Sequence, residues 1–145
     1  MTEQITSNPA EMDPDAGLRD RLADEFMAEA AFDGWTRAAL AASGRALDLP
    51  AGEAERLFPG GPLQALAYVS ERADRRTVED MEKEGASTLR IRDRITRAVR
   101  IRLERHIGPR EAARRALSTL SLPLNAGLAL KLLYKTVDAL SLIHI

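Results

Sequence analysis

The chain has 145 residues, of which 45% are hydrophobic and 30% charged, ordinary values for one soluble domain with a real core. It contains no cysteine, which excludes disulfides, thiolate metal ligands and thiol catalysis. No stretch approaches the roughly 20 apolar residues of a membrane-spanning helix. The acidic N-terminus also lacks the apolar core of a signal or transit peptide.

Residues 1–14 contain polar residues and two prolines without periodicity, which predicts a disordered tail. Residues 15–62 are predicted to form a helix-turn-helix-like unit of three helices. These helices are expected over 15–33, 36–43 and 52–57, each bounded by glycine or proline. Short helices separated by tight turns are typical of helix-turn-helix proteins.

Local signals support these boundaries. Asp15 is a plausible N-cap of the first helix, and Thr36 of the second. Trp35 follows Gly34, and a large aromatic residue after such a turn is expected to be buried at the junction of the first two helices. The segment 58–62, which reads Phe-Pro-Gly-Gly-Pro, is a strong break.

Residues 63–139 are predicted to form a second helical region, with helices over 63–84, 87–107, 110–120 and 125–139. No run alternates polar and apolar residues as a strand would, so the fold class is all-α. In the first of these helices, the side chains expected to face the core are Leu66, Val69, Ala73 and Met81.

The segment 87–107 is predicted to be the central helix, about 30 Å long. Its apolar residues recur every four positions, which predicts that they form a stripe in the core while arginines face solvent. The stripe consists of Ile91, Ile95, Val99 and Leu103. The arginines of the opposite face are Arg90, Arg94, Arg97 and Arg105. An arginine-rich amphipathic helix also suits anionic lipid or nucleic acid.

The net charge of −1 conceals a segregation of charge along the chain. Residues 1–34 hold nine acids and two bases, a net of −7, whereas residues 86–122 hold ten bases and three acids, a net of +7. We therefore expect the acidic first helix to lie near the basic central helix. Exposed ion pairs contribute only about 0–1 kcal/mol each, so such pairing governs arrangement more than stability.

The sequence offers no catalytic or metal-binding constellation. His106 and His144 lack the spacing of metal ligands, and the acidic cluster over 79–84 resembles a solvated helix face. Motifs for phosphate, dinucleotide or acyl-transfer chemistry are absent. We therefore predict a protein that is not an enzyme and that requires neither a metal nor a catalytic cofactor.

The helix-turn-helix plan of TetR-type regulators raises DNA binding as an alternative. A recognition helix presents cationic or hydrogen-bonding side chains to phosphates and bases. The third helix offers Glu53 and Glu55 against Arg56, and two carboxylates repel a polyanion. A transcriptional regulator binding DNA and a small apolar effector therefore stays as the alternative function.

Six short motifs between Leu18 and Ala139 occur in the order and spacing of one family. They are Gly34-Trp35-Thr36 with Ala39-Leu40, Leu57-Phe58-Pro59-Gly60-Gly61-Pro62, the stretch from Arg92 to Arg102-Leu103, Arg115-Ala116-Leu117, Leu122-Pro123-Leu124-Asn125 and Thr136-Val137-Asp138. In these motifs the chain resembles the COQ-nine family of ubiquinone biosynthesis accessory proteins, in its bacterial form.

This resemblance implies a TetR-like fold that lost DNA recognition and binds an isoprenoid or quinone lipid between its later helices. It implies a homodimer, cytoplasmic and peripheral to the inner membrane, that presents a quinone precursor to the di-iron hydroxylase of the pathway. No nucleic acid is expected. The expected lipid-binding residues are Leu66, Val69, Met81, Ile95, Val99, Leu117, Leu120, Leu128, Leu132 and Val137.

The chain departs from the family pattern after Ala139. The transposon end sequence used as an adapter in sequencing libraries encodes residues 140–145 in one of its reading frames. We therefore expect these residues to be a non-native tail on a truncated protein. The family continues here with helices that dimerise, complete the pocket and contact membrane. Without them, the apolar helix over 125–139 should expose one side, and the chain should be marginally stable and self-associate.

Overall fold

The computed structural model describes residues 13–141 and confirms the all-α class, because this range contains seven α-helices, two 3₁₀-helices and no strand. Most of the predicted tail 1–14, and residues 142–145 of the predicted non-native tail, lie outside the described residues. The helices are α2 (Ala16–Asp33), α3 (Arg37–Ala46), α4 (Glu53–Leu57), α5 (Pro62–Lys83), α6 (Ile91–Arg105), α7 (Arg110–Leu120) and α8 (Ala126–Ser141).

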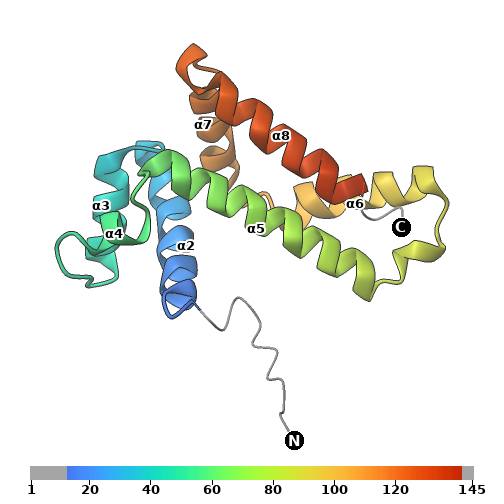
Figure 1. The fold of residues 1–145 in the computed structure, drawn as a ribbon, viewed down its shortest axis with the longest axis horizontal. Coiled ribbons are helices and arrows are strands. Elements are labelled where there is room, and N and C mark those ends of the chain that lie inside the picture. Colours follow the sequence, from blue (N-terminus) through green and yellow to red (C-terminus); the bar gives the residue numbers. More distant parts are fainter. Residues whose placement is uncertain (1–12, 142–145) are drawn as a thin grey trace, which may run out of the picture.

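Helix α5 is the longest helix, and α2, α6 and α8 pack on it (Figure 1). Helices α2, α3 and α4 gather at its N-terminal end, and α6 returns along its C-terminal part. Helix α8 lies along α5, and α7 connects this layer back to α2. The predicted boundaries of α2 to α5 hold to within about three residues, as expected for helix ends.

The two predicted caps differ in outcome. Thr36 caps α3 as predicted, since its Oγ1 accepts a hydrogen bond from the Ala39 backbone amide at 3.1 Å. Asp15 occupies the N-cap position of α2, but its side chain makes no capping hydrogen bond. Instead its carboxylate accepts hydrogen bonds from Arg56 of α4, at 2.8 and 3.1 Å. Asp15 therefore ties α4 to the start of α2.

Trp35 is buried between α2 and α3, which confirms the prediction for this residue. Only 8% of it is exposed, and its ring centroid lies 5.0 Å from that of Phe26. Its indole Nε1 donates a hydrogen bond to the Ala112 carbonyl of α7 at 2.9 Å. One side chain thus joins α2, α3 and a helix that follows almost eighty residues later.

The main core runs through both predicted regions of the chain. It contains residues from α2, α3, α4, α5 and α7, and the inward positions predicted for α5 are all buried. A second, smaller cluster lies between α5 and α6. Its members are Met81, Ala86, Ala98 and Ile101.

Helix α6 corrects two expectations. It is shorter than the predicted helix, because the chain turns at Gly85 with φ +66° and forms a 3₁₀-helix, Ala86–Thr88, before α6 begins. Its apolar stripe also faces outward: Ile91, Ile95, Val99 and Leu103 are 41–57% exposed. The side of the helix that carries Ala98 and Ile101 packs on α5 instead.

The reason for this rotation is electrostatic. The side of α5 that faces α6 carries carboxylates. They form ion pairs with the arginines of α6. Arg97, Arg102 and Arg105 therefore point toward α5 rather than toward solvent. The apolar stripe, on the other side, meets no described helix that covers it.

The charge segregation along the chain also resolves differently from the prediction. The acids of α2 that form ion pairs are Asp20 and Asp24, and both bind Arg72 of α5, at 3.3 and 2.6 Å. The basic α6 pairs with α5. The acidic first helix and the basic central helix therefore each pair with α5 rather than with each other.

Helices α7 and α8 expose much apolar surface. The buried residues of α7 are Ala112 and Ala116, whereas Leu117, which was predicted to bind lipid, is 70% exposed. In α8 Leu132 is buried, and the other side of the helix is exposed, as predicted. The exposed large hydrophobic residues of α8 are Leu130, Leu133, Tyr134 and Val137, at 56–72%.

Candidate functional site

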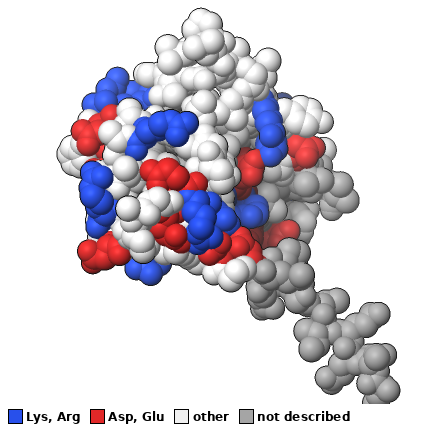
Figure 2. Space-filling model, turned by 60° about the vertical axis from the view of Figure 1, so that its left-hand side comes forward, with Lys and Arg blue, Asp and Glu red and all other residues white. Residues whose placement is uncertain are grey.

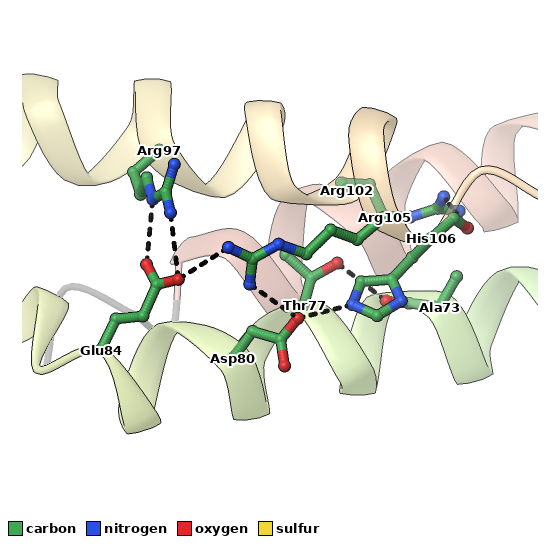
Figure 3. A network of polar contacts seen from close by, with 8 residues as sticks. All are labelled: Ala73, Thr77, Asp80, Glu84, Arg97, Arg102, Arg105 and His106. Atoms are coloured by element: carbon green, nitrogen blue, oxygen red, sulfur yellow. Dashed lines mark hydrogen bonds and ion pairs between the residues drawn. The ribbon is translucent and has the colours of Figure 1, made fainter.

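A polar network holds α6 against α5 (Figure 3). Glu84 accepts hydrogen bonds from Arg97 at 2.9 and 3.0 Å and from Arg105 at 2.9 Å. Asp80 lies 2.8 Å from Nε2 of His106 and 3.3 Å from Arg105. His106, expected to be incidental, thus has a defined partner, and the acidic cluster is not simply solvated.

The network keeps its two carboxylates ionised. The hydrogen bond from His106 is the main cause that lowers the pKa of Asp80, and that from Arg97 is the main cause that lowers the pKa of Glu84. A carboxylate with a lowered pKa is a weak base, so this geometry suits positioning better than proton abstraction. Its consequence is that the apolar side of α6 is held outward.

A buried carboxylate extends the network to a third helix. Asp74 of α5, whose side chain is 7% exposed, accepts a hydrogen bond from Nε of Arg102 at 3.0 Å. Its other oxygen accepts a hydrogen bond from Oγ1 of Thr136 in α8 at 2.9 Å. Arg102 in turn donates to the His106 carbonyl at the end of α6, at 3.0 Å. Asp74 therefore fixes α6 and α8 relative to α5.

We expect acid to weaken this network. A group whose pKa is lowered on folding stabilises the fold above its usual pKa, here 3.8 for Asp80 and 4.5 for Glu84. That contribution is lost as the pH falls through the lowered folded value. The urea midpoint should therefore drop between neutral pH and about pH 3, and drop less in an Asp80→Asn, Glu84→Gln double variant.

The exposed Glu79, on the same helix, supplies the control for this experiment. A Glu79→Gln variant should follow the pH dependence of the unmodified chain. If the double variant followed it equally closely, the two carboxylates would contribute nothing to acid sensitivity.

The ten residues predicted to bind lipid do not gather around one cavity. Leu66 and Val69 belong to the main core, Met81 to the cluster under α6, and Leu132 is buried in α8. Leu120 and Leu128 are half-buried. The exposed members are Ile95, Val99, Leu117 and Val137, at 41–70%. They share an outward position on α6, α7 and α8 rather than a common pocket.

An open groove of about 380 Å³, not predicted from the sequence, lies between α5 and α8. Lys135 of α8 forms an ion pair with Glu71 of α5 beside it. The acids of this groove recur at helical spacing along α5, which is the signal that the sequence offered. The lining residues are Glu71, Asp74, Arg75, Val78, Glu79, Glu82, Lys135 and Ala139, none of them predicted to bind lipid.

The later helices present a surface of exposed large apolar side chains. Soluble monomers rarely expose large apolar patches, and those that do use them for partners, ligands or membranes. These side chains come from α6, α7, α8 and the segments that connect them. They are Ile91, Ile95, Val99, Leu103, Ile107, Leu117, Leu122, Leu124, Leu130, Leu133, Tyr134 and Val137. This surface, which we call the apolar surface of α6–α8, is the candidate functional site.

Residues 13–141 contain no group of three or more His, Cys, Asp or Glu side chains placed to hold a metal ion. In the same range, no single helix has the length and apolarity to span a membrane. Helix α7 and the segment Pro123–Ala139 meet the length and composition criteria only together, across a bend of 92°.

Comparison with known proteins returned no match to a family model, to a curated protein or to a solved structure.

Proposed function

We propose that this chain is a lipid-binding accessory protein of ubiquinone biosynthesis with a TetR-like arrangement of helices. It binds an isoprenoid quinone precursor and presents it to the membrane-associated di-iron hydroxylase of the pathway, without catalysing a reaction itself. The observation that carries the proposal is the apolar surface of α6–α8, together with the ordered motifs of the sequence.

An isoprenoid tail matches the chemistry of this surface. The tail is long, branched and purely apolar, so it gains free energy by contact with leucine, isoleucine and valine side chains. Covering each such side chain is worth about 1.5–3 kcal/mol. Val99 of α6, Leu117 of α7 and Val137 of α8 are each more than two-fifths exposed and offer this contact from three helices.

The position of the ten predicted residues divides them into two roles. The buried residues Leu66, Val69, Met81 and Leu132 pack in the protein interior and are not proposed as lipid contacts. The accessible residues, which the proposal retains as lipid contacts, are Ile95, Val99, Leu117, Leu120, Leu128 and Val137.

The alternative of a DNA-binding regulator draws on the three-helix unit α2–α4. Its α4 is five residues long, and Arg56, the cation of that helix, binds Asp15 and Glu53. Glu55 on the same helix is exposed. A short helix that presents a carboxylate while its arginine is already paired disfavours contact with phosphates.

The proposal places the protein in the bacterial cytoplasm, peripheral to the inner membrane, where quinone precursors reside. It also includes a homodimer, because joining two copies would cover part of the apolar surface. The bound lipid is its cargo, and no metal or organic cofactor takes part.

The test of this function is the capture of quinone. Purified from a quinone-producing bacterium, the chain should carry an isoprenoid quinone or precursor that native mass spectrometry detects after gentle desorption. A Val99→Asn, Val137→Asn double variant should carry at least about tenfold less, since each substitution removes apolar contact.

The exposed Phe32 of α2, 80% accessible and far from α6–α8 in the sequence, provides a matched control. Phe32→Asn should leave the amount of bound quinone unchanged. Absence of any isoprenoid compound, with no saturable binding of a short-chain quinone in detergent, would contradict the proposed function.

A further inference from the structure

The corner between α7 and α8 projects from the body of the molecule as an uncharged knob. Figure 1 shows this corner at the top of the fold, and Figure 2 shows the same end without blue or red atoms. Residues 116–130 contain no Asp, Glu, Lys, Arg or His. Leu124 at its tip is 97% exposed, and Leu122 beside it is 53% exposed.

Several polar groups of the corner form hydrogen bonds within it or with the adjoining turn of α7. Asn125 Nδ2 donates to the Thr119 carbonyl at 2.8 Å, and its backbone amide donates to the Leu122 carbonyl at 2.9 Å. The hydroxyls of Ser118 and Ser121 donate to the carbonyls of Arg114 and Ser118, at 3.2 and 2.8 Å. Internal satisfaction of this kind is what an apolar medium demands of irregular backbone.

Cationic side chains lie on both helices below the corner. Arg114 of α7 and Lys131 of α8 are exposed, roughly 7–9 Å from the corner along the helix axes at 1.5 Å per residue. Residues 110–135 hold five bases and one acid, Glu111, a net of +4. Glu111 pairs with Arg114 and Arg115, and Lys135 pairs with Glu71.

We infer that the α7–α8 corner inserts into the surface of an anionic lipid bilayer. Leu122 and Leu124 enter the boundary between head groups and acyl chains, and the cations below meet anionic head groups. Interfacial elements typically insert by about 5–10 Å, which matches the distance from the corner to Arg114 and Lys131. Each cation near such a surface strengthens binding about fivefold.

A lipid bilayer fits the corner better than a second copy of the chain does. The corner is convex and projecting, whereas two copies need complementary surfaces of substantial area. The net positive charge of its surroundings, +3 when Glu71 is counted together with residues 110–135, would also repel its symmetry mate but attract anionic lipid. The inference goes beyond the proposed function, since bilayer binding requires no quinone. Its inserting residues, Leu122 and Leu124, belong to the apolar surface of α6–α8 but are not among the six retained lipid contacts.

The absence of cysteine allows a direct test with single-cysteine variants of the full chain. Leu124→Cys and Phe32→Cys are each labelled with an environment-sensitive dye and mixed with quinone-free vesicles. Because both sites are highly exposed, neither substitution disturbs packing. With phosphatidylglycerol-containing vesicles, the dye at position 124 should shift to the blue and be quenched by brominated acyl chains. The dye at position 32 should not respond.

Sedimentation with the same vesicles measures the affinity. A Leu122→Gln, Leu124→Gln double variant should lose at least about tenfold in bilayer partitioning, and Lys131→Gln about fivefold. Arg21→Gln, which alters an exposed cation of α2, should lose much less. Vesicles of phosphatidylcholine alone should bind the unmodified chain more weakly than anionic ones.

Three results would overturn the inference. The first is an equal dye response at positions 124 and 32. The second is bilayer partitioning that the Leu122→Gln, Leu124→Gln double variant leaves unchanged. The third is a dye shift at position 124 that grows with protein concentration when no vesicles are present. The last would show that another copy of the chain covers the corner. Quinone binding in detergent is measured separately. A chain that does not bind vesicles can therefore still bind quinone, and a chain that does not bind quinone can still bind vesicles.

Discussion

Replacing Trp35 with alanine is expected to lower the free energy of unfolding by about 3–5 kcal/mol. The side chain is 8% exposed and packs on Phe26, so its loss leaves a cavity in the main core. It also leaves the Ala112 carbonyl without the indole hydrogen bond that spans 2.9 Å. Because Trp35 joins α2, α3 and α7, the substitution should weaken the packing of all three helices.

Urea unfolding followed by far-ultraviolet circular dichroism measures this effect, since the variant lacks the single tryptophan of the chain. Trp35→Phe keeps most of the ring and loses the indole N–H, so its cost should be smaller. Phe32→Ala, at an 80% exposed site, should change stability by no more than about 0.5 kcal/mol. A cost below about 1 kcal/mol for Trp35→Ala would mean that the junction of α2, α3 and α7 does not depend on this residue.

Replacing Asp74 with alanine is expected to cost about 2–4 kcal/mol. The substitution removes the carboxylate that binds Arg102 at 3.0 Å and Thr136 at 2.9 Å. Arg102, 19% exposed, then keeps its charge in a largely buried position with its bond to the His106 carbonyl alone. Both α6 and α8 should become more loosely held to α5.

A double-mutant cycle with Arg102→Ala separates the ion pair from the loss of packing. We expect a coupling energy of about 1–3 kcal/mol between the two positions. Glu79→Ala, an exposed acid of the same helix, is the control and should lie within about 0.5 kcal/mol of the unmodified chain. Additive effects of Asp74→Ala and Arg102→Ala would contradict the role assigned to this pair.

The amino-acid sequence determined most of the helix boundaries. Gly34, Thr36 and the segment 58–62 mark breaks and a cap whose causes are local, namely positive φ, a side-chain hydrogen bond and the geometry of proline. The inward residues of α5 were predictable for a related reason. A helix packed along most of its length buries the residues of its apolar stripe whichever elements cover it.

The orientation of α6 could not be predicted in this way. Its sequence carries an apolar side and an arginine side, and either could face the body of the protein. Asp74, Asp80 and Glu84, which precede their arginine partners by 13 to 28 residues, draw the arginines inward. The sequence pattern reveals the two sides of a helix but not which side finds partners.

The candidate site depended on the same long-range information. Residues such as Leu66 and Val137 belong to equally regular apolar patterns, yet one is 5% exposed and the other 56%. What separates them is the packing of distant helices: Leu66 lies under α2–α4, whereas no described helix covers Val137. The sequence by itself thus determined where the helices are and which of their sides are apolar, because these depend on residues a few positions apart. Only the tertiary structure decided which apolar sides are buried and which remain for a ligand or a bilayer, because that depends on contacts between residues far apart in the chain.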